Sequence, residues 1–332
     1  MRHLLDIADL DRNDIERICE RARSFAEIGG REIKKVPTLR GRTVVSLFLE
    51  ASTRTSSSFE LAAKRLSADV ISLKATGSSL DKGESLRDTI STLTAYGAEA
   101  IILRHPQAGA ARLVAEWAEA AVINAGDGKH QHPTQALLDV HTLQNRLGSL
   151  EGRSIWIVGD VLHSRVARSN IGAFLTMGAS VTVCGPPTLL PRGIEALGCR
   201  VESSLDGLGE ADVVYALRIQ NERMVDAALV PSLREYIDGY QITPRRLGPR
   251  QLVMHPGPVN RGVELASELV GAPNSLIAAQ VASGLVVRMA VLYEVLTRAG
   301  GLSAVPEPTP PRSTTPTTVR SLTPASPIGD PA

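Results

Sequence analysis

The chain has 332 residues, enough for two domains with separate hydrophobic cores. Its 36 Lys and Arg and 35 Asp and Glu nearly balance, which excludes the basic field that nucleic acids and anionic membrane surfaces attract. Because the longer apolar stretches, such as 98–103 and 276–296, are short or interrupted by charges, and the N-terminus has no apolar signal segment, we expect a cytoplasmic protein without nucleic-acid or membrane partners.

The first predicted element is a strand at residues 43–50, TVVSLFLE, whose apolar and β-branched side chains are typical of a buried parallel strand. Apolar residues then recur at helical spacing from Phe59 onward, so a helix should begin near residues 52–55. Such a junction offers backbone N–H groups and the positive end of a helix dipole, and Arg54 adds a fork of charged donors. STRT therefore predicts an anion site. An ordinary Ser52 N-cap beside a solvated arginine is the alternative for this segment alone.

Two further basic residues follow in the first half. Residues 77–85, GSSLDKGES, form a predicted polar loop that carries Lys82, and a merely solvated connection is the alternative. Arg104 ends the apolar run AEAIILR, which places it at the carboxyl end of a predicted strand. Ligands bind at that edge of open α/β sheets, although a solvated arginine would also fit there.

Residues 124–139, NAGDGKHQHPTQALLD, lead from a Gly-rich loop into a predicted helix, with Pro133 suited to its first turn. His132 and Gln135 stand three residues apart at this start, so we expect them on one side of it. A buried histidine with satisfied hydrogen bonds is the alternative. The helix has an apolar face that includes Leu137 and should bridge the two halves of the chain.

The second half repeats the layout of an apolar strand, a polar loop and a helix. Residues 159–170, GDVLHSRVARSN, place Arg165 at a helix start, and the missing GxGxxG disfavours a nicotinamide cofactor. Arg218 and Gln220 lie two residues apart after another strand, so they project to the same side if that strand continues; a polar strand face is the alternative. Residues 254–262, MHPGPVNRG, are too rich in Pro and Gly for a helix or central strand, which leaves carbonyls available as acceptors.

The alternation of strands and helices predicts an α/β fold: two open parallel-sheet αβα domains, bridged by helices, with a ligand cleft between them. A last helix should end at Gly300 and Gly301, and residues 302–332 are mostly Pro, Thr and Ser and should be disordered. The odd number of cysteines, without CxxC or Cys/His metal spacing, favours core or surface thiols.

The candidate residues form two anion-binding groups. The first suits a phosphate and the second suits two carboxylates, which bidentate arginine forks recognise. Two polar residues stand between them. The phosphate group contains Ser52, Thr53, Arg54, Thr55 and Arg104; the carboxylate group contains Arg165 and Arg218; His132 and Gln135 lie between the groups.

In this order along the chain, STRT, RHPQ, HPTQALLD, GDVLHSRVARS, RIQNER and HPGPVNRG resemble the motifs of aspartate carbamoyltransferase catalytic chains, over residues 3–300. The resemblance implies transfer of the carbamoyl group of carbamoyl phosphate to the α-amine of L-aspartate, which gives N-carbamoyl-L-aspartate and phosphate in an early step of pyrimidine biosynthesis. It further implies a carbamoyl-phosphate-binding domain at residues 1–132 plus 284–301, an aspartate-binding domain at 133–283, and a homotrimer with shared active sites. It implies no metal or organic cofactor. Whether regulatory chains or a dihydroorotase bind the trimer is left open.

The resemblance also assigns roles to single residues. The phosphate would be held by Ser52, Thr53, Arg54, Thr55 and Arg104, with Ser79 (or Ser78) and Lys82 from a neighbouring subunit. Around the carbamoyl group, His132, Thr55 and Arg104 would hold the carbonyl oxygen, Gln135 the amide, and the backbone of Gly257 and Pro258 the amines. Aspartate would be held by Arg165, Arg218, Gln220 and Lys82. The chain departs from the family pattern at Ala51 and Ser56, where Pro and Arg are usual.

Two alternatives differ in substrate or class. Ornithine carbamoyltransferases share the phosphate-binding group but recognise their amino acid with an SMG loop and an HCLP segment. The corresponding places here hold Arg218-Ile219-Gln220 and HPGP, and arginines fit a dicarboxylate and repel a diamine. A non-catalytic scaffold for another pyrimidine-pathway enzyme is the second alternative, which the intact polar residues of both groups disfavour.

Overall fold

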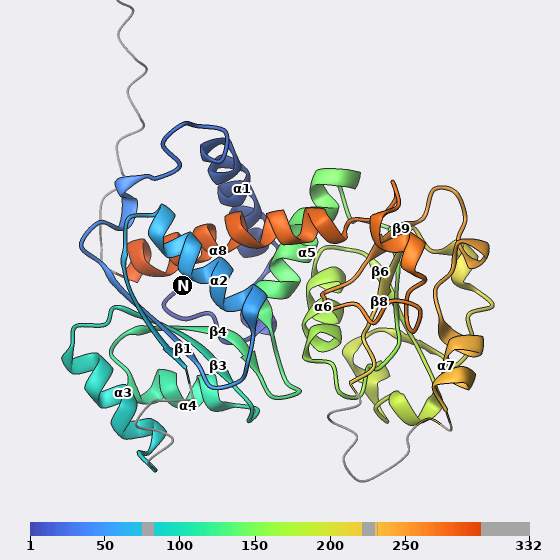
Figure 1. Ribbon diagram of the computed structural model, residues 1–332, viewed down its shortest axis with the longest axis horizontal. Helices are drawn as coiled ribbons and strands as arrows, with labels where there is room; N and C mark the ends of the chain where they lie inside the picture. The colour runs from blue at the N-terminus through green and yellow to red at the C-terminus, as the bar shows by residue number, and fades with distance from the viewer. Residues whose placement is uncertain (75–82, 221–229, 231, 300–332) are drawn as a thin grey trace, which may run out of the picture. The chain divides into compact units, whose positions relative to one another are not determined.

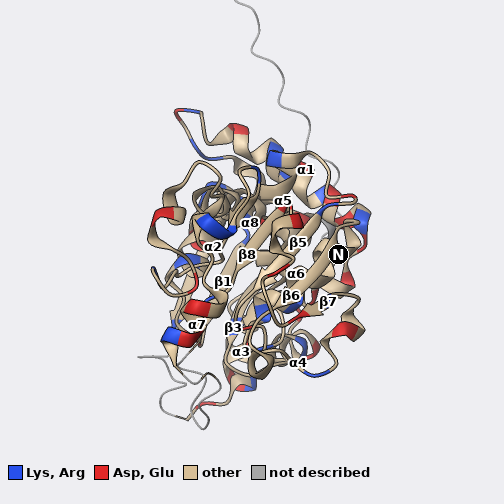
Figure 2. Ribbon diagram, turned by 90° about the vertical axis from the view of Figure 1, so that its right-hand side faces the viewer, with Lys and Arg blue, Asp and Glu red and all other residues tan. Residues whose placement is uncertain are grey.

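Two parallel β-sheets with flanking helices organise the part of the chain that the structure, a computed structural model, describes: residues 1–74, 83–220, 230 and 232–299 (Figure 1). These residues belong to one compact unit, Met1–Gly301. The predicted α/β class with two open parallel sheets is confirmed. Lys and Arg are interspersed with Asp and Glu in the view of Figure 2.

Within the described residues, the first sheet has four parallel strands in the order β2-β1-β3-β4. Successive side chains on a strand face opposite sides, so Val45 packs under α3 and α4, whereas Val44 packs under α1, α2 and α8. Both faces of the sheet are therefore covered. The elements are α1 (Arg12–Ile28), β1 (Thr43–Phe48), α2 (Thr53–Arg65), β2 (Asp69–Lys74), α3 (Leu86–Ala95), β3 (Ala100–His105), α4 (Ala110–Trp117) and β4 (Ala121–Asp127).

The second sheet, within the same described ranges, has five parallel strands in the order β7-β6-β5-β8-β9. Its strands and helices are β5 (Ser154–Val158), α6 (Arg165–Thr176), β6 (Ser180–Cys184), β7 (Arg200–Glu202), β8 (Val213–Ala216), α7 (Leu233–Tyr240) and β9 (Leu252–Met254). Short 3-10 helices complete the loops: η1 (Ile7–Asp9), η2 (Pro37–Leu39), η4 (Pro187–Leu189), η5 (Ile194–Leu197), η6 (Leu208–Glu210), η8 (Pro244–Arg246) and η9 (Ser267–Gly271).

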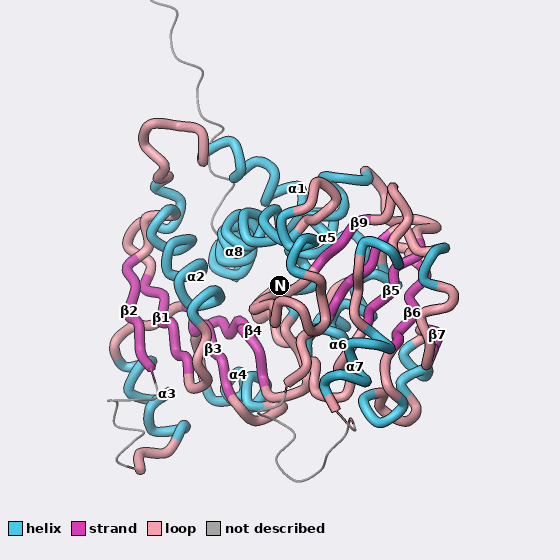
Figure 3. The backbone as a smooth tube through the Cα atoms, turned by 45° about the vertical axis from the view of Figure 1, so that its right-hand side comes forward, coloured by secondary structure: helices cyan, strands magenta, loops and turns pink. Residues whose placement is uncertain are grey.

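Helices α5 (Pro133–Leu147) and α8 (Ile277–Ala299) lie between the two groups of strands (Figure 3). Helix α5 packs against α1, α6 and α8, so it is buried on all sides from Pro133 to Leu143, and not on the single apolar face that its sequence indicated. Its buried side chains include Asp139 and His141. The predicted bridging role of this helix is confirmed, and its polar residues become part of the core.

Helix α8 differs from the sequence expectation. The segment Ile277–Thr297 is long and apolar enough to cross a membrane by length and composition, although the sequence suggested that it is too interrupted. However, 67% of its apolar window is buried inside the protein, where α8 packs against α1, α2 and α5. Its apolar character is therefore that of a core helix.

The remaining sequence expectations concern the cysteines, Leu61 and the end of the chain. All three cysteines are buried and free, so they are core thiols. Leu61, which belongs to the apolar residues that recur at helical spacing from Phe59 onward, is 44% exposed on α2. Gly300, Gly301 and the predicted disordered tail lie outside the described residues.

Both sheets reverse their strand order beside the first strand of the sheet. In the first, β1 lies between β2 and β3, and in the second, β5 lies between β6 and β8. In open parallel sheets, ligands bind outside the carboxyl ends of the strands at this switch point. The loops that follow β1, β3, β5 and β8 are therefore the expected places for a site, and these loops carry most of the predicted residues.

Candidate active site

The predicted phosphate-binding segment is the loop between β1 and α2 together with the first turn of α2. Ser52 is the N-cap of this 13-residue helix, and its Oγ accepts a hydrogen bond of 3.3 Å from the backbone N–H of Thr55. Ser56, where the family usually has Arg, donates to the Ser52 carbonyl oxygen at 2.5 Å. Thr53 and Arg54 are exposed in the first turn, beside the positive end of the helix dipole. The predicted position of the helix start is confirmed.

Arg104 extends from the end of β3 toward this helix start. It pairs in register with Phe48 of β1, so its side chain reaches the loop that follows β1. Its Nη1 donates to Ser52 Oγ at 3.3 Å, and its Nη2 donates to Glu50 Oε1 at 2.8 Å. The structure thus brings Arg104 and the STRT segment together, although at least 48 residues lie between them in the sequence.

Glu50 joins the two predicted anion-binding groups. Its carboxylate accepts hydrogen bonds from Arg104 and also from Arg165, whose Nη1 lies 3.1 Å from Oε2 and whose Nη2 donates to Oε1. Burial by itself would raise the pKa of Glu50, but the hydrogen bonds and charges of Arg165 and Arg104 outweigh it and lower this pKa to about 2. Glu50 is therefore ionised and holds both arginines.

The sequence analysis did not select Glu50. An acidic residue at the end of the predicted strand 43–50, two positions before the N-cap serine, was the available signal. That position becomes informative only once the fold shows which arginines surround it.

Arg165 is the first residue of α6, and its side chain is 8% exposed. Its Nη1 donates to the Gly128 carbonyl at 2.9 Å, so the Gly-rich loop after β4 contacts the guanidinium. Gly126, with φ of +119°, makes this close approach possible, because a Cβ there would lie 3.0 Å from Arg165 Nε. The predicted carboxylate-binding arginine is thus fixed from two sides.

His132 and Gln135 lie at the start of α5, as predicted. His132 is the N-cap residue, is 4% exposed, and donates its backbone N–H to Ser169 Oγ at 2.8 Å. Its Nδ1 is buried without a hydrogen-bond partner among the residues that the structure describes. Burial lowers the pKa of His132 well below 6.5, and the charges of Arg104, Arg165 and Arg288 lower it further. The imidazole is therefore neutral, and a hydrogen-bonding position of its ring faces no described protein group.

The loop after β9 approaches the phosphate-binding segment. Gly257 has φ of +67°, and a Cβ at this position would lie 3.0 Å from the guanidinium carbon of Arg54. Its backbone N–H donates to His255 Nδ1 at 2.8 Å, and His255 Nε2 lies 3.1 Å from the buried carboxylate of Glu264. The predicted Gly257 and Arg54 are thus neighbours, although Arg54 follows β1 of the first sheet and Gly257 follows β9 of the second.

This contact gives a testable prediction. Gly257→Ala should lower kcat by about tenfold or more, because the new Cβ displaces the Arg54 guanidinium in addition to straining the backbone. Gly262→Ala is the matched control: φ there is +81°, but a Cβ would meet nothing within 4 Å. Steady-state kinetics and thermal unfolding of both variants separate the two effects. Equal activity losses in the two variants would contradict the contact with Arg54.

Arg218 and Gln220 are placed differently from the expectation. Strand β8 ends at Ala216, so neither residue lies on a strand, and the same-side spacing argument does not apply. Gln220 is instead held by two hydrogen bonds among the described residues: its backbone N–H donates to Asp160 Oδ2 and its Nε2 donates to the His163 carbonyl, both at 3.1 Å. This ties Gln220 to the loop before Arg165. Ser78, Ser79 and Lys82 lie outside the described residues.

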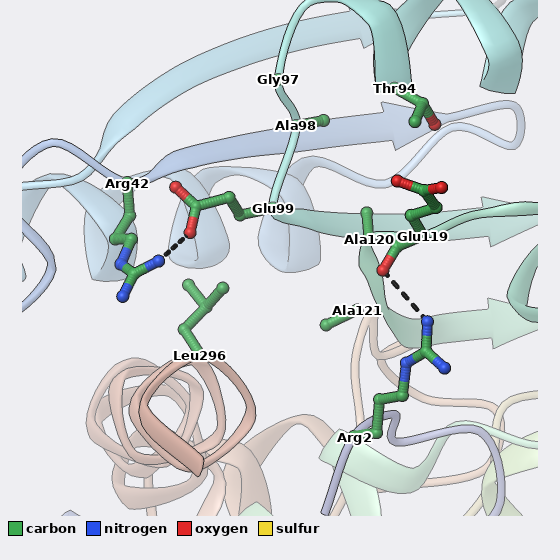
Figure 4. Close-up of a pocket in the computed structure, with 10 residues that line it drawn as sticks. All are labelled: Arg2, Arg42, Thr94, Gly97, Ala98, Glu99, Glu119, Ala120, Ala121 and Leu296. Atoms are coloured by element: carbon green, nitrogen blue, oxygen red, sulfur yellow. Dashed lines mark hydrogen bonds and ion pairs between the residues drawn. The ribbon is translucent and has the colours of Figure 1, made fainter. Parts of the chain in front are cut away.

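A pocket of about 350 Å³ lies at the opposite edge of the first sheet (Figure 4). Its lining includes Glu99 and Ala121, at the amino ends of β3 and β4, and the ion pair of Arg42 with Glu99 crosses one side. Arg2 donates to the Glu119 carbonyl at 3.2 Å on the other side. The pocket is therefore separate from the residues at the carboxyl ends of the strands.

These features describe an α/β protein in which arginines and helix N-termini suited to small anions gather where two parallel sheets present the carboxyl ends of their strands. Models of two domains match the chain: "Aspartate/ornithine carbamoyltransferase, carbamoyl-P binding domain" over residues 2–145, and "Aspartate/ornithine carbamoyltransferase, Asp/Orn binding domain" over residues 151–295. The chain belongs to the aspartate/ornithine carbamoyltransferase family.

Similar proteins agree with this family. The aspartate carbamoyltransferase catalytic subunit of Acidothermus cellulolyticus is 54% identical over 300 residues, which cover 89% of this chain and 93% of the relative. That of Salinispora arenicola is 55% identical over 305 residues, with 89% and 98% covered. The catalytic subunit of M. jannaschii aspartate transcarbamoylase superposes with a TM-score of 0.79 at 35% identity, over 91% of this chain and 99% of that one. Aspartate transcarbamoylase from Trypanosoma cruzi in complex with carbamoyl phosphate gives 0.80 at 32% identity, with 89% and 96% covered.

Proposed function

We propose that this chain transfers the carbamoyl group of carbamoyl phosphate to the α-amine of L-aspartate, forming N-carbamoyl-L-aspartate and phosphate in pyrimidine biosynthesis. The observation that carries the proposal is the arrangement around Glu50, where Arg104 beside the α2 N-terminus and Arg165 at the α6 N-terminus are held together. The relatives, all named as aspartate carbamoyltransferase catalytic subunits, support this choice within the family.

The first turn of α2 is the proposed phosphate site. Ser52, Thr53 and Thr55 supply hydroxyl and backbone donors, and Arg54 and Arg104 supply charged forks that suit a phosphate. Ser79 and Lys82 join this set by resemblance. A phosphate at the N-terminus of α2 is favoured by the helix dipole as well as by the two arginines.

The amino-acid substrate is proposed to bind through Arg165, Arg218 and Gln220, with Lys82 added by resemblance. Two arginines can pair with the two carboxylates of aspartate through bidentate hydrogen bonds. The second amine of ornithine would instead meet positive charge. This difference favours aspartate over ornithine as the acceptor.

The reaction joins the two sites. The neutral α-amine attacks the carbonyl carbon, a C–N bond forms, the C–O bond to phosphate breaks, and the amine proton leaves with the phosphate. Negative charge builds on the carbonyl oxygen, which Thr55, Arg104 and His132 are proposed to stabilise, while Gln135 and the backbone of Gly257 and Pro258 bind the carbamoyl amine. One donor aimed at such an oxygen contributes about 3–4 kcal/mol, and orienting both substrates contributes up to about 7–11 kcal/mol.

The test is a direct assay of carbamoyl transfer by the purified full chain. With carbamoyl phosphate as donor, aspartate should be converted and ornithine should not. Preference for ornithine would replace the proposal with the other activity of the family. Transfer to neither amino acid, by a folded chain, would favour the scaffold role.

His132→Ala should lower kcat by about 100-fold while the affinity for carbamoyl phosphate changes by less than about tenfold, because the imidazole donor is matched to charge that develops in the transition state. Since burial and nearby arginines keep His132 neutral, the pH dependence of kcat between pH 6 and 9 should keep its shape in the variant. His130→Ala, at a partly exposed histidine two positions away, is the control. Equal losses in kcat and binding would assign His132 to ground-state binding.

We also propose a homotrimer in which Lys82 completes the site of a neighbouring subunit. Lys82→Ala and Arg54→Ala homotrimers should each be nearly inactive, and refolding the two together should restore activity. A mixed trimer contains a single interface with both intact residues, so about a third of wild-type activity is expected. Solution mass establishes the trimer. Inactive mixtures in which mixed trimers are shown to form would refute sharing through Lys82.

The proposed domain limits follow the division between the carbamoyl phosphate site and the aspartate site. Residues 1–132 with 284–301 form the carbamoyl-phosphate-binding domain, and residues 133–283 form the aspartate-binding domain. The packing of α8 against α1 and α2 supports assigning the end of the chain to the first domain. We place the enzyme in the cytoplasm, with its two substrates and its own subunits as partners and without a metal or organic cofactor.

A further inference from the structure

Asp139, in the middle of α5, is fully buried and has no role in the proposed site so far. Its carboxylate accepts hydrogen bonds from side chains on four different elements: α5, α6, β8 and α8. Among the described residues, Oδ1 accepts from Gln135 Nε2 at 3.1 Å and Gln280 Nε2 at 2.7 Å, and Oδ2 accepts from Asn170 Nδ2 at 2.9 Å and Tyr215 Oη at 2.7 Å.

All of these partners donate, so the arrangement requires an ionised carboxylate, which only accepts. Burial raises the pKa of Asp139 to about 6, although the hydrogen bonds from Gln280, Asn170, Tyr215 and Gln135 act in the opposite direction. A buried carboxylate is costly to maintain, and a leucine or methionine would fill a helix core at less cost. This points to a role for the charge in organising its donors.

The Oδ1 side of Asp139 connects two parts of the proposed carbamoyl site. Gln280 donates to Asp139, and its Oε1 accepts the backbone N–H of His255 at 3.0 Å. His255 Nδ1 in turn accepts the backbone N–H of Gly257 at 2.8 Å. A continuous series of hydrogen bonds therefore runs from Gln135 through Asp139 and Gln280 to the loop that contains Gly257.

The direction of these bonds determines what Gln135 can recognise. Because its Nε2 donates to Asp139, its Oε1 is left as the acceptor at the other end of the amide. An acceptor suits the N–H groups of a carbamoyl amine. If the amide of Gln135 turned over, it would present a donor and would no longer match that amine.

We propose that Asp139 is a positioning residue for recognition of the carbamoyl amine: it fixes the amide orientation of Gln135 and, through Gln280 and His255, the position of the Gly257 loop. This inference rests on the proposed function. It assigns to Asp139 the discrimination between carbamoyl phosphate and an acyl phosphate with a methyl group in place of the amine. Acetyl phosphate is that analogue.

Asp139→Asn is the central test, because it keeps the shape but replaces an acceptor with a donor. The KM for carbamoyl phosphate and the inhibition constant of acetyl phosphate are measured in the wild type and the variant. The preference for carbamoyl phosphate is the inhibition constant of acetyl phosphate divided by the KM for carbamoyl phosphate. It should fall by at least about tenfold, while the inhibition constants of acetyl phosphate and of inorganic phosphate change by less than about threefold. An unchanged preference in a folded, active variant would overturn the inference. A wild-type chain that fails to carbamoylate aspartate would instead overturn the proposed function.

A double-mutant cycle tests whether Asp139 acts through Gln135. In a Gln135→Ala background, Asp139→Asn should change the preference for carbamoyl phosphate by no more than about fivefold, the part that acts through Gln280 and His255, since the rest of its effect depends on the Gln135 amide. An undiminished tenfold or larger loss in that background would show that Asp139 does not act through Gln135, and the inference would fail.

Two substitutions around Asp139 decide the question if Asp139→Asn does not fold. Gln280→Met removes a donor to Oδ1 and the link to His255, so it should reduce the preference by about fivefold or more. Tyr215→Phe removes a donor to Oδ2, away from Gln135, and should leave the preference within about twofold. A purely structural role of Asp139 predicts similar, small changes in preference for both variants, together with lower thermal stability.

Discussion

Arg54→Ala is expected to lower kcat by about a thousandfold or more and to leave the fold intact. Arg54 is exposed in the first turn of α2, so the substitution removes no core contact. Its guanidinium lies beside Gly257 and next to the positive end of the helix, where the phosphate is proposed to bind. Charged donors that contact a transferring or departing phosphate contribute about 10³ to 10⁵ in rate, because they stabilise charge that grows in the transition state.

The measurement is kcat of the purified variant, with circular dichroism and thermal unfolding to verify the fold. Lys64→Ala is the matched control, because it removes a positive charge near the other end of the same helix, where Lys64 pairs with the exposed Glu60. That control should keep wild-type kcat, since an exposed ion pair contributes little. An Arg54→Ala variant that retains more than about a tenth of wild-type kcat would remove Arg54 from the proposed chemistry.

Parts of the site that obey local rules could be predicted from the sequence. The serine that caps α2, the arginine at the end of β3 and the histidine at the start of α5 each follow from a strand end or helix start. Parallel sheets then bring these positions to the same edge, because the carboxyl ends of parallel strands lie together. The fold class follows from the same alternation of elements.

Other features depend on tertiary contacts that local patterns do not contain. The sequence indicated a single apolar face for α5 and did not select Asp139, but α1, α6 and α8 bury this helix on all sides. The same-side argument for Arg218 and Gln220 required the strand to continue, but β8 ends at Ala216, and the backbone N–H of Gln220 donates to Asp160. Glu50 was not selected because its partners, Arg104 and Arg165, are 54 and 115 residues away.

Glu50→Gln is the second variant with a large expected effect. Arg104 and Arg165 both donate to Glu50 Oε1, and Arg165 also donates to Oε2. A glutamine offers one acceptor oxygen and no charge, so Glu50→Gln removes one of these contacts and leaves both arginines without their counter-charge. Removing the charge of one partner leaves the other charges of a partly buried cluster uncompensated. We expect kcat/KM for aspartate to fall by about 10- to 100-fold, since the arginine of each proposed substrate site loses the carboxylate that positions it.

The stability of the same variant should depend on pH. The pKa of Glu50 is lowered to about 2 in the folded chain, from a usual value of 4.5, so its ionised form stabilises the fold above pH 4.5. After allowance for its partial exposure, Glu50→Gln should lower the free energy of unfolding at pH 7 by about 1–2 kcal/mol. The difference from the wild type should shrink as the pH falls below 4.5 toward 2. A constant difference across that range would show that charge is not the cause.

Binding of inorganic phosphate separates the two roles of Glu50. Loss of its negative charge, taken alone, would strengthen phosphate binding, because Arg104 would be less neutralised. Loss of its positioning role would lower kcat whether or not phosphate binds more tightly. We therefore expect Glu50→Gln to leave inhibition by phosphate unchanged or to make it tighter, together with the lower kcat/KM. The control Glu60→Gln, at an exposed ion pair on α2, should change neither quantity. If Glu50→Gln weakened phosphate binding and kept kcat, Glu50 would support the phosphate site alone and would not link it to Arg165.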